Sequence, residues 1–216
     1  MSAQQALDEL KVGNKRFVAH LHHEVPTDNH NRQHELIINQ KPIAIIVGCS
    51  DARVPPELVF DQGMGDLFVI RVAGNIVMPS QIESVEFAAL QFGPRLIVVL
   101  GHSQCGALQA TIGALKGPPE RVADMYPTVV EYVRPSVDAA IEACPNGTDD
   151  EILHTATHAN VRRSMAELRK GSVSLRRLEA EEGLMVVGAH YAIETGVVEF
   201  FEDAKVGPVS KEKTTL

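Results

Sequence analysis

The sequence contains no tryptophan, only three cysteines, and no long uninterrupted run of apolar residues. Three widely spaced cysteines do not form a disulfide framework. No apolar segment approaches the roughly 18–20 residues that a membrane-spanning helix needs. The first ten residues also lack the basic and apolar regions of a secretory signal peptide. We therefore expect a reduced, cytoplasmic protein, in which cysteines serve metal binding or catalysis more often than crosslinking.

Positive charge is also scarce. The chain has 20 lysines and arginines against 28 aspartates and glutamates, and its formal net charge is −8. The basic residues are scattered rather than gathered in a stripe with aromatic residues. This charge balance argues against a general affinity for nucleic acids or acidic membranes. We therefore expect neither nucleic acid nor membrane among the partners.

What the chain does contain is enough apolar material for one sizeable core, since 44% of its 216 residues are hydrophobic. The first twenty residues show the apolar period of an amphipathic helix, which Gly13 weakens. Residues 21–41 are polar and rich in histidine. We expect residues 1–41 to form an N-terminal helical arm and connector, and residues 42–216 to form a single α/β domain.

Short, wholly apolar runs alternate with helical patterns through this domain. Such runs are typical of strands buried on both faces of a parallel sheet. A last apolar segment follows a Glu-Thr-Gly turn closely enough to pair antiparallel. We expect an α/β fold with a central, mostly parallel sheet of four parallel strands plus an antiparallel edge strand, flanked by helices. The expected strands cover 42–47, 67–70, 96–100, 184–189 and 197–201. The expected helices cover about 81–92, capped by Ser80 and Glu83, then a proline-broken region over 118–145, then 149–170 and 174–182.

Two polar loops follow the first and third predicted strands, at the carboxyl ends where open α/β sheets bind their ligands. They carry two thiols and an imidazole: Cys49, His102 and Cys105. His102 and Cys105 are three residues apart, which is close enough for both to reach one ion from a single turn. Three protein ligands with an open fourth position are the pattern of catalytic zinc, and thiolates with imidazole favour zinc over magnesium or calcium.

The order Cys-x-Asp-x-Arg at 49–53 and His-x-x-Cys-Gly at 102–106 resembles the β-class carbonic anhydrase family, most densely over 43–114. The resemblance implies one Zn²⁺ per subunit, held by Cys49, His102 and Cys105, with Asp51 and Arg53 as a catalytic dyad. It implies a lyase that converts carbon dioxide reversibly to bicarbonate and a proton. It also implies a homodimer or homotetramer, because family members wrap an N-terminal arm around a partner subunit.

The expected mechanism is attack on CO₂ by zinc-bound hydroxide, which Asp51 orients while Arg53 keeps that carboxylate ionised. In some family members the equivalent aspartate ligates zinc in a closed, low-pH form, and activity would then appear only above about pH 8. Two other functions stay open. One is hydrolysis of carbonyl sulfide or carbon disulfide on the same fold, and the other is a non-catalytic zinc-binding protein.

A substrate as small and apolar as CO₂ calls for a narrow, mostly apolar pocket. Phe68 and Ala73 are candidates to line it, and Gly106 is a candidate through its backbone N–H. Gln40 falls on the position of a glutamine that lines the cleft in plant-type relatives.

The other histidines and the third cysteine have ordinary structural explanations. His154 and His158 lie four apart on a predicted helix, a spacing that can bind zinc. However, residues 155–157 are Thr-Ala-Thr and supply no H-E-x-x-H pattern, so a structural role is favoured. His190 is expected in the core or at an interface, the connector histidines at the surface, and Cys144 away from the zinc.

Overall fold

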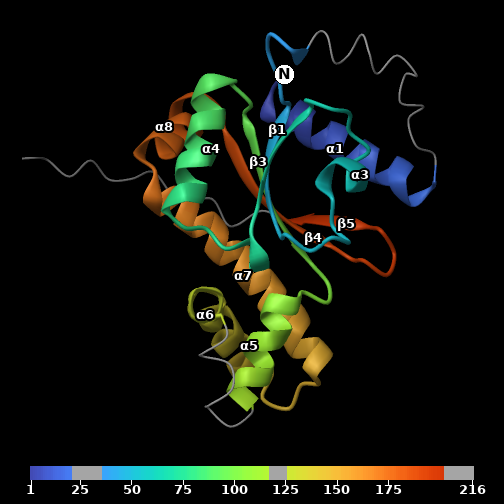
Figure 1. The fold of residues 1–216 in the computed structure, drawn as a ribbon, viewed down its shortest axis with the longest axis vertical. Coiled ribbons are helices and arrows are strands. Elements are labelled where there is room, and N and C mark those ends of the chain that lie inside the picture. The colour runs from blue at the N-terminus through green and yellow to red at the C-terminus, as the bar shows by residue number, and fades with distance from the viewer. Residues whose placement is uncertain (21–35, 117–125, 202–216) are drawn as a thin grey trace, which may run out of the picture.

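The computed structural model describes residues 1–20, 36–116 and 126–201, and its centre is a five-stranded sheet (Figure 1). The strand order is β2-β1-β3-β4-β5. The first four strands run parallel, and β5 pairs antiparallel with β4 at the edge. This confirms the predicted fold class. The strands are β1 (Ala44–Gly48), β2 (Leu67–Arg71), β3 (Leu96–His102), β4 (Met185–Tyr191) and β5 (Val198–Phe201).

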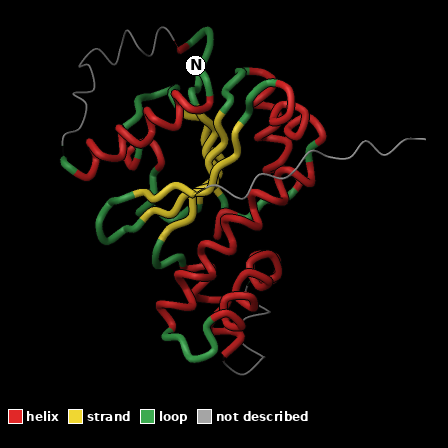
Figure 2. The backbone as a smooth tube through the Cα atoms, turned by 180° about the vertical axis from the view of Figure 1, so that it is seen from behind, coloured by secondary structure: helices red, strands yellow, loops and turns green. Residues whose placement is uncertain are grey.

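Helices cover both faces of this sheet (Figure 2), because the central strands β1 and β3 are apolar on both sides and fully buried. One face carries α1 (Ala3–Val18) and α3 (Pro56–Val59), and the other carries α4 (Pro79–Gln91), α7 (Asp149–Gly171) and α8 (Val173–Glu181). Two more helices, α5 (Gly106–Lys116) and α6 (Pro127–Ala143), pack with the start of α7 in a third apolar cluster. No helix in the described ranges is long and apolar enough to span a bilayer.

The predicted capping box of α4 is wrong. The helix begins at Pro79, one residue before Ser80, because proline is well suited to the first helical position and needs no N–H partner there. The side chain of Gln81, not of Glu83, reaches back and accepts a hydrogen bond of 3.2 Å from the N–H of Met78. The helix therefore starts two residues before the predicted range.

In the described part of the region 118–145, proline interrupts the helix less than the sequence predicts. Pro127 opens α6, and Pro135 lies inside that helix without ending it. Residues 117–125, which include the first part of the region expected to be broken, lie outside the described residues.

The helix α1 docks against the end of α3 and the turn before β5 through Gly13 and Asn14. A Cβ atom at Gly13 would lie 1.8 Å from the carbonyl oxygen of Phe60, so only glycine allows this approach. Next to it, the Asn14 amide donates to the carbonyls of Val59 (3.0 Å) and Gly196 (2.9 Å). Gly13, which weakens the helical pattern in the sequence, is therefore the residue that lets α1 pack closely against Phe60.

Replacing Gly13 by alanine should lower the free energy of unfolding by about 1–3 kcal/mol, the usual cost of overpacking. Urea denaturation measures this. The matched control is Gly113→Ala in α5, where the space around the glycine is open. That change should raise stability by about 0.5–1 kcal/mol through helix propensity. Equal effects of the two substitutions would show that α1 does not dock as described.

Candidate metal centre

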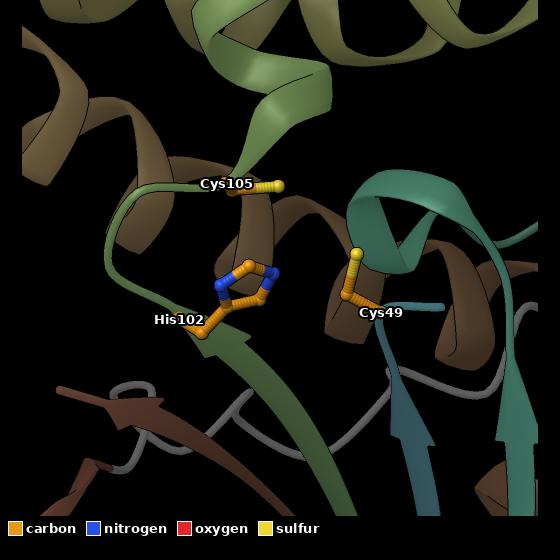
Figure 3. A group of neighbouring side chains, drawn as sticks. All are labelled: Cys49, His102 and Cys105. Atoms are coloured by element: carbon orange, nitrogen blue, oxygen red, sulfur yellow. The ribbon is translucent and has the colours of Figure 1, made fainter. Parts of the chain in front are cut away.

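The pairing of β1 with β3 brings the two predicted loops side by side. Cys49 follows the last residue of β1, His102 is the last residue of β3, and Cys105 directly precedes α5. The two sulfurs and a ring nitrogen all lie within 4.8 Å of one another. In Figure 3 these three atoms face the same space. All three residues are at least 95% buried, so the structure brings together the group that the sequence predicts as ligands.

The hydrogen bonding of the His102 ring leaves one of its two nitrogens unprotonated, with a free lone pair. Its Nδ1 lies 2.8 Å from the carbonyl oxygen of Ser103, which can only accept, so Nδ1 carries the proton. Its Nε2 is buried and has no hydrogen-bond partner among the residues that the structure describes. An unsatisfied buried acceptor costs about 1–3 kcal/mol, and a metal ion would satisfy it. A metal-binding histidine usually donates the N–H of its other ring nitrogen to an oxygen, and this hydrogen bond fixes the tautomer. The three residues therefore fit Zn²⁺.

Backbone N–H groups are directed at both sulfurs. The N–H of Asp51 donates to Cys49, and those of Ala107 and Leu108, in the first turn of α5, donate to Cys105. A helix N-terminus stabilises an anion in this way. A hydrogen bond from the Cys105 thiol, with help from His102, lowers the pKa of Cys49 to about 4. The same Cys49 contact, together with burial, raises the pKa of Cys105. The pair thus shares one tightly held proton, which a divalent cation would replace.

The turn between His102 and Cys105 depends on an unusual backbone conformation. Gln104 has a φ of 54°, in the left-handed region that non-glycine residues rarely adopt. Its carbonyl accepts a 3.1 Å hydrogen bond from Nη2 of Arg53, and its side-chain oxygen accepts one of 2.7 Å from Gln109. These contacts hold a strained turn that lets the imidazole and the thiol face one another.

Asp51 and Arg53 form a two-point ion pair beside the three ligands. Nε of Arg53 lies 2.9 Å from Oδ1 of Asp51, and Nη2 lies 2.7 Å from Oδ2. The backbone N–H of Arg53 also donates to Oδ1 at 3.0 Å. The guanidinium holds the pKa of the Asp51 carboxyl well below its usual range. The carboxylate is therefore ionised and directed by Arg53, and it is not part of the group of three ligand atoms.

Arg71 supports the ligand loop in a way that the sequence reading missed. Its Nε donates to the carbonyl of Cys49 at 2.8 Å, and its Nη2 donates to the carbonyl of Asp51. Arg71 pairs in register with Gly48, directly before the loop. The available signal was a cationic residue at the carboxyl end of an apolar strand, where its side chain meets the neighbouring loop.

The four candidate pocket residues separate into two groups. Gly106 opens α5 next to Cys105, and Ala73 lies in a short 3₁₀ turn, Ala73–Asn75, that contacts both α5 and β1. Phe68 instead packs against Phe92, with ring centroids 5.9 Å apart, near the amino end of β2. Gln40 precedes β1, at the opposite end of that strand from Cys49. Of these four residues, Ala73 and Gly106 lie at the edge of the sheet that carries the ligands.

The remaining cysteine lies apart from this group. Cys144 directly follows α6, and its sulfur lies 3.5 Å from the hydroxyl of Thr155. By contrast, His154, His158 and His190 come together in a second group.

Comparisons with known proteins agree on one family. A family model described as carbonic anhydrase matches residues 44–198. The carbonic anhydrase of Mycolicibacterium smegmatis is 37% identical over 192 residues, which cover 88% of this chain and 89% of that protein. Carbonic anhydrase 2 of Mycobacterium tuberculosis is 38% identical, with 87% of each chain covered.

Solved structures give the same result for the fold. The β-carbonic anhydrase CafA of Aspergillus fumigatus superposes with a TM-score of 0.74 at 23% identity, covering 92% of both chains. A structure reported for two tetrameric β-carbonic anhydrases of Sordaria macrospora gives a TM-score of 0.69 at 27% identity, covering 80% of this chain and 86% of that one.

Proposed function

Because the chain belongs to the β-carbonic anhydrase family, we propose that it hydrates CO₂ reversibly to bicarbonate and a proton with one Zn²⁺ per subunit. The observation that carries the proposal is the buried group of Cys49, His102 and Cys105, in which Nε2 of the imidazole has no hydrogen-bond partner in the described part of the chain. Two thiolates and one neutral imidazole suit zinc and leave a fourth position for water. When bound there, Zn²⁺ lowers the pKa of water so that a strong nucleophile exists near neutral pH.

The residues around the ligands direct the reaction. Asp51 accepts a hydrogen bond from the attacking oxygen and turns the lone pair of that oxygen toward the carbon of CO₂. Arg53 binds the two carboxylate oxygens with separate N–H groups, which a lysine could not do with the same fixed geometry. Since Arg53 also donates to the carbonyl of Gln104, the dyad is tied to the loop that carries His102 and Cys105.

The ion pair also bears on the closed alternative, in which Asp51 is itself a zinc ligand. Both of its carboxylate oxygens are engaged by Arg53, so ligation would require Asp51 to give up at least one of these hydrogen bonds. This geometry supports the open arrangement as the working form. For the substrate pocket, the geometry supports Ala73 and Gly106 as lining residues.

A homo-oligomer, either a dimer or a tetramer, is part of the proposal. The Sordaria macrospora structure is described as that of tetrameric enzymes. In this chain, Ile37, Ile38 and Met64 are more than half exposed, and their neighbours Leu36 and Gly65 are in contact. Large apolar side chains grouped on a surface favour a protein contact over solvent.

The test compares substrates and metal states of the full chain. CO₂ hydration is followed by stopped-flow with a pH indicator, and hydrolysis of carbonyl sulfide and carbon disulfide is followed by sulfide release. We expect CO₂ to be the much faster substrate. Activity should disappear after dialysis against a chelator and return with Zn²⁺. Faster sulfide release would identify the sulfur hydrolase, and a zinc-loaded protein inactive on CO₂ at every pH would identify a non-catalytic zinc protein.

A further inference from the structure

A second group of metal-binding side chains lies where α7 crosses β4. His154 and His158 are one turn apart on α7, and His190 extends from β4 toward that helix. One ring nitrogen from each lies within 4.8 Å of the others. The ring centroids are 4.6 Å apart for His154 and His158, 5.2 Å for His154 and His190, and 5.0 Å for His158 and His190. Three imidazoles thus converge on one small region.

Two of these rings present nitrogen atoms that have no hydrogen-bond partner within residues 1–20, 36–116 and 126–201. These atoms are the buried Nε2 atoms of His158 and His190, and His190 as a residue is 7% exposed. Such orphaned polar atoms are uncommon in folded proteins and are costly. Burial lowers the pKa of both rings, to about 4 for His190. At neutral pH these rings are therefore uncharged, which is the form that binds metal.

The charges around the group permit a cation. Glu199 stands directly opposite His190 in the β4–β5 pairing, and its negative charge acts on His158. Arg162 contributes the opposing positive charge, and its guanidinium lies 5.0 Å from the ring centroid of Phe201. Glu194 adds a further negative charge that acts on His190. The nearby acidic groups therefore offset the arginine.

The group is also reachable from solvent. His154 is exposed, and it lines an open pocket of about 670 Å³ whose wall also includes Asp150 and Glu151. Acidic residues on the wall favour the approach of a cation. His154 is exposed, His158 is half-buried and His190 is buried, so the group leads from the surface into the fold, as the entry of a metal ion requires.

We propose that His154, His158 and His190 form a second metal site that takes a divalent transition ion such as Zn²⁺ or Co²⁺ through three imidazole nitrogens. Imidazole suits these ions, and three histidines with an open position are an established zinc arrangement. No carboxylate of the described residues belongs to this group, so the fourth position would be open to water. The site contains no sulfur, so its chemistry differs from that of the Cys49 group. A bound ion would tie α7 to β4, the strand that pairs with β3 and its terminal His102.

The experiment titrates chelator-stripped full-length protein with Co²⁺ and records the absorption spectrum and the metal retained after gel filtration. We expect two equivalents per chain. One should show intense thiolate-to-cobalt charge transfer in the near ultraviolet, and the other only weaker visible bands, because nitrogen ligands lack that transition. In His154→Gln the second equivalent should be lost while the thiolate band stays. His154 is exposed, so this change carries little risk to folding.

A connector variant is the matched control, because that segment is also rich in histidine. It should retain the second equivalent when asparagine replaces His22, His23, His30 and His34. The proposal is overturned if the wild-type chain retains one equivalent, if His154→Gln retains two, or if the connector variant loses the second. A missing thiolate band would instead count against the proposed catalytic site, so the two failures are separable.

Discussion

Replacing Cys105 by serine is expected to lower kcat/KM for CO₂ hydration by at least about a thousandfold, because the metal that generates the nucleophile loses a ligand. A serine hydroxyl stays protonated at neutral pH and is a weak zinc ligand, whereas a cysteine thiol gives up its proton when it binds the ion. Bound zinc should fall from one equivalent per chain to a small fraction. Stopped-flow kinetics and elemental analysis of the same sample measure both quantities.

The matched control is Cys144→Ser, which makes the same chemical change outside the ligand group. It should keep both the activity and the zinc. His102→Ala should reproduce the loss seen with Cys105→Ser, since it removes the lone pair at Nε2. Full activity in Cys105→Ser would show that this sulfur does not hold a catalytic metal.

Asp51→Asn is expected to lower kcat/KM by about 10²–10³-fold, the usual contribution of a group that positions or accepts a proton in the transition state. Zinc should remain bound, because Asp51 lies outside the ligand group. Asparagine keeps the shape of the side chain but loses the charge that Arg53 holds. Activity that falls only in proportion to lost zinc would contradict this role.

Two further variants sharpen the result for Asp51. Asp138→Asn is the control, because Asp138 is an exposed aspartate paired with Arg134 at 3.4 Å on α6, and it should leave the activity unchanged.

Arg53→Ala releases the Asp51 carboxylate from its two-point pairing, so that it can compete for the open coordination position. The ratio of the rate at pH 9 to the rate at pH 7 should therefore be larger in Arg53→Ala than in wild type. An unchanged ratio would show that Arg53 does not restrain Asp51.

The fold and the first metal group could be predicted from the sequence because both depend on local patterns. Apolar runs identified the parallel strands, and parallel strands place the residues that follow them at one edge. Cys49, His102 and Cys105 all stand at such positions. The group of His154, His158 and His190 could not be predicted in this way. The position of His190 beside the other two rings depends on where α7 crosses the sheet.

Contacts between segments that lie far apart in the sequence are harder to predict. The sequence shows that Phe68 is apolar, but not that it packs against Phe92 near the amino end of β2. It also does not show that Gln40 and Cys49 lie beyond opposite ends of β1. Gly13 was read as a weak point, because the contact that requires it is with Phe60, a residue distant in the sequence.

The hydrogen bonds from Arg71 to the carbonyls of Cys49 and Asp51 have a consequence for how the protein acquires its metal. These bonds fasten the loop to the neighbouring strand and involve neither sulfur nor carboxylate, so the backbone of the loop does not depend on a metal ion for its shape. We therefore expect the chain to fold before it binds zinc, and removal of zinc to lower activity much more than it lowers the amount of folded protein.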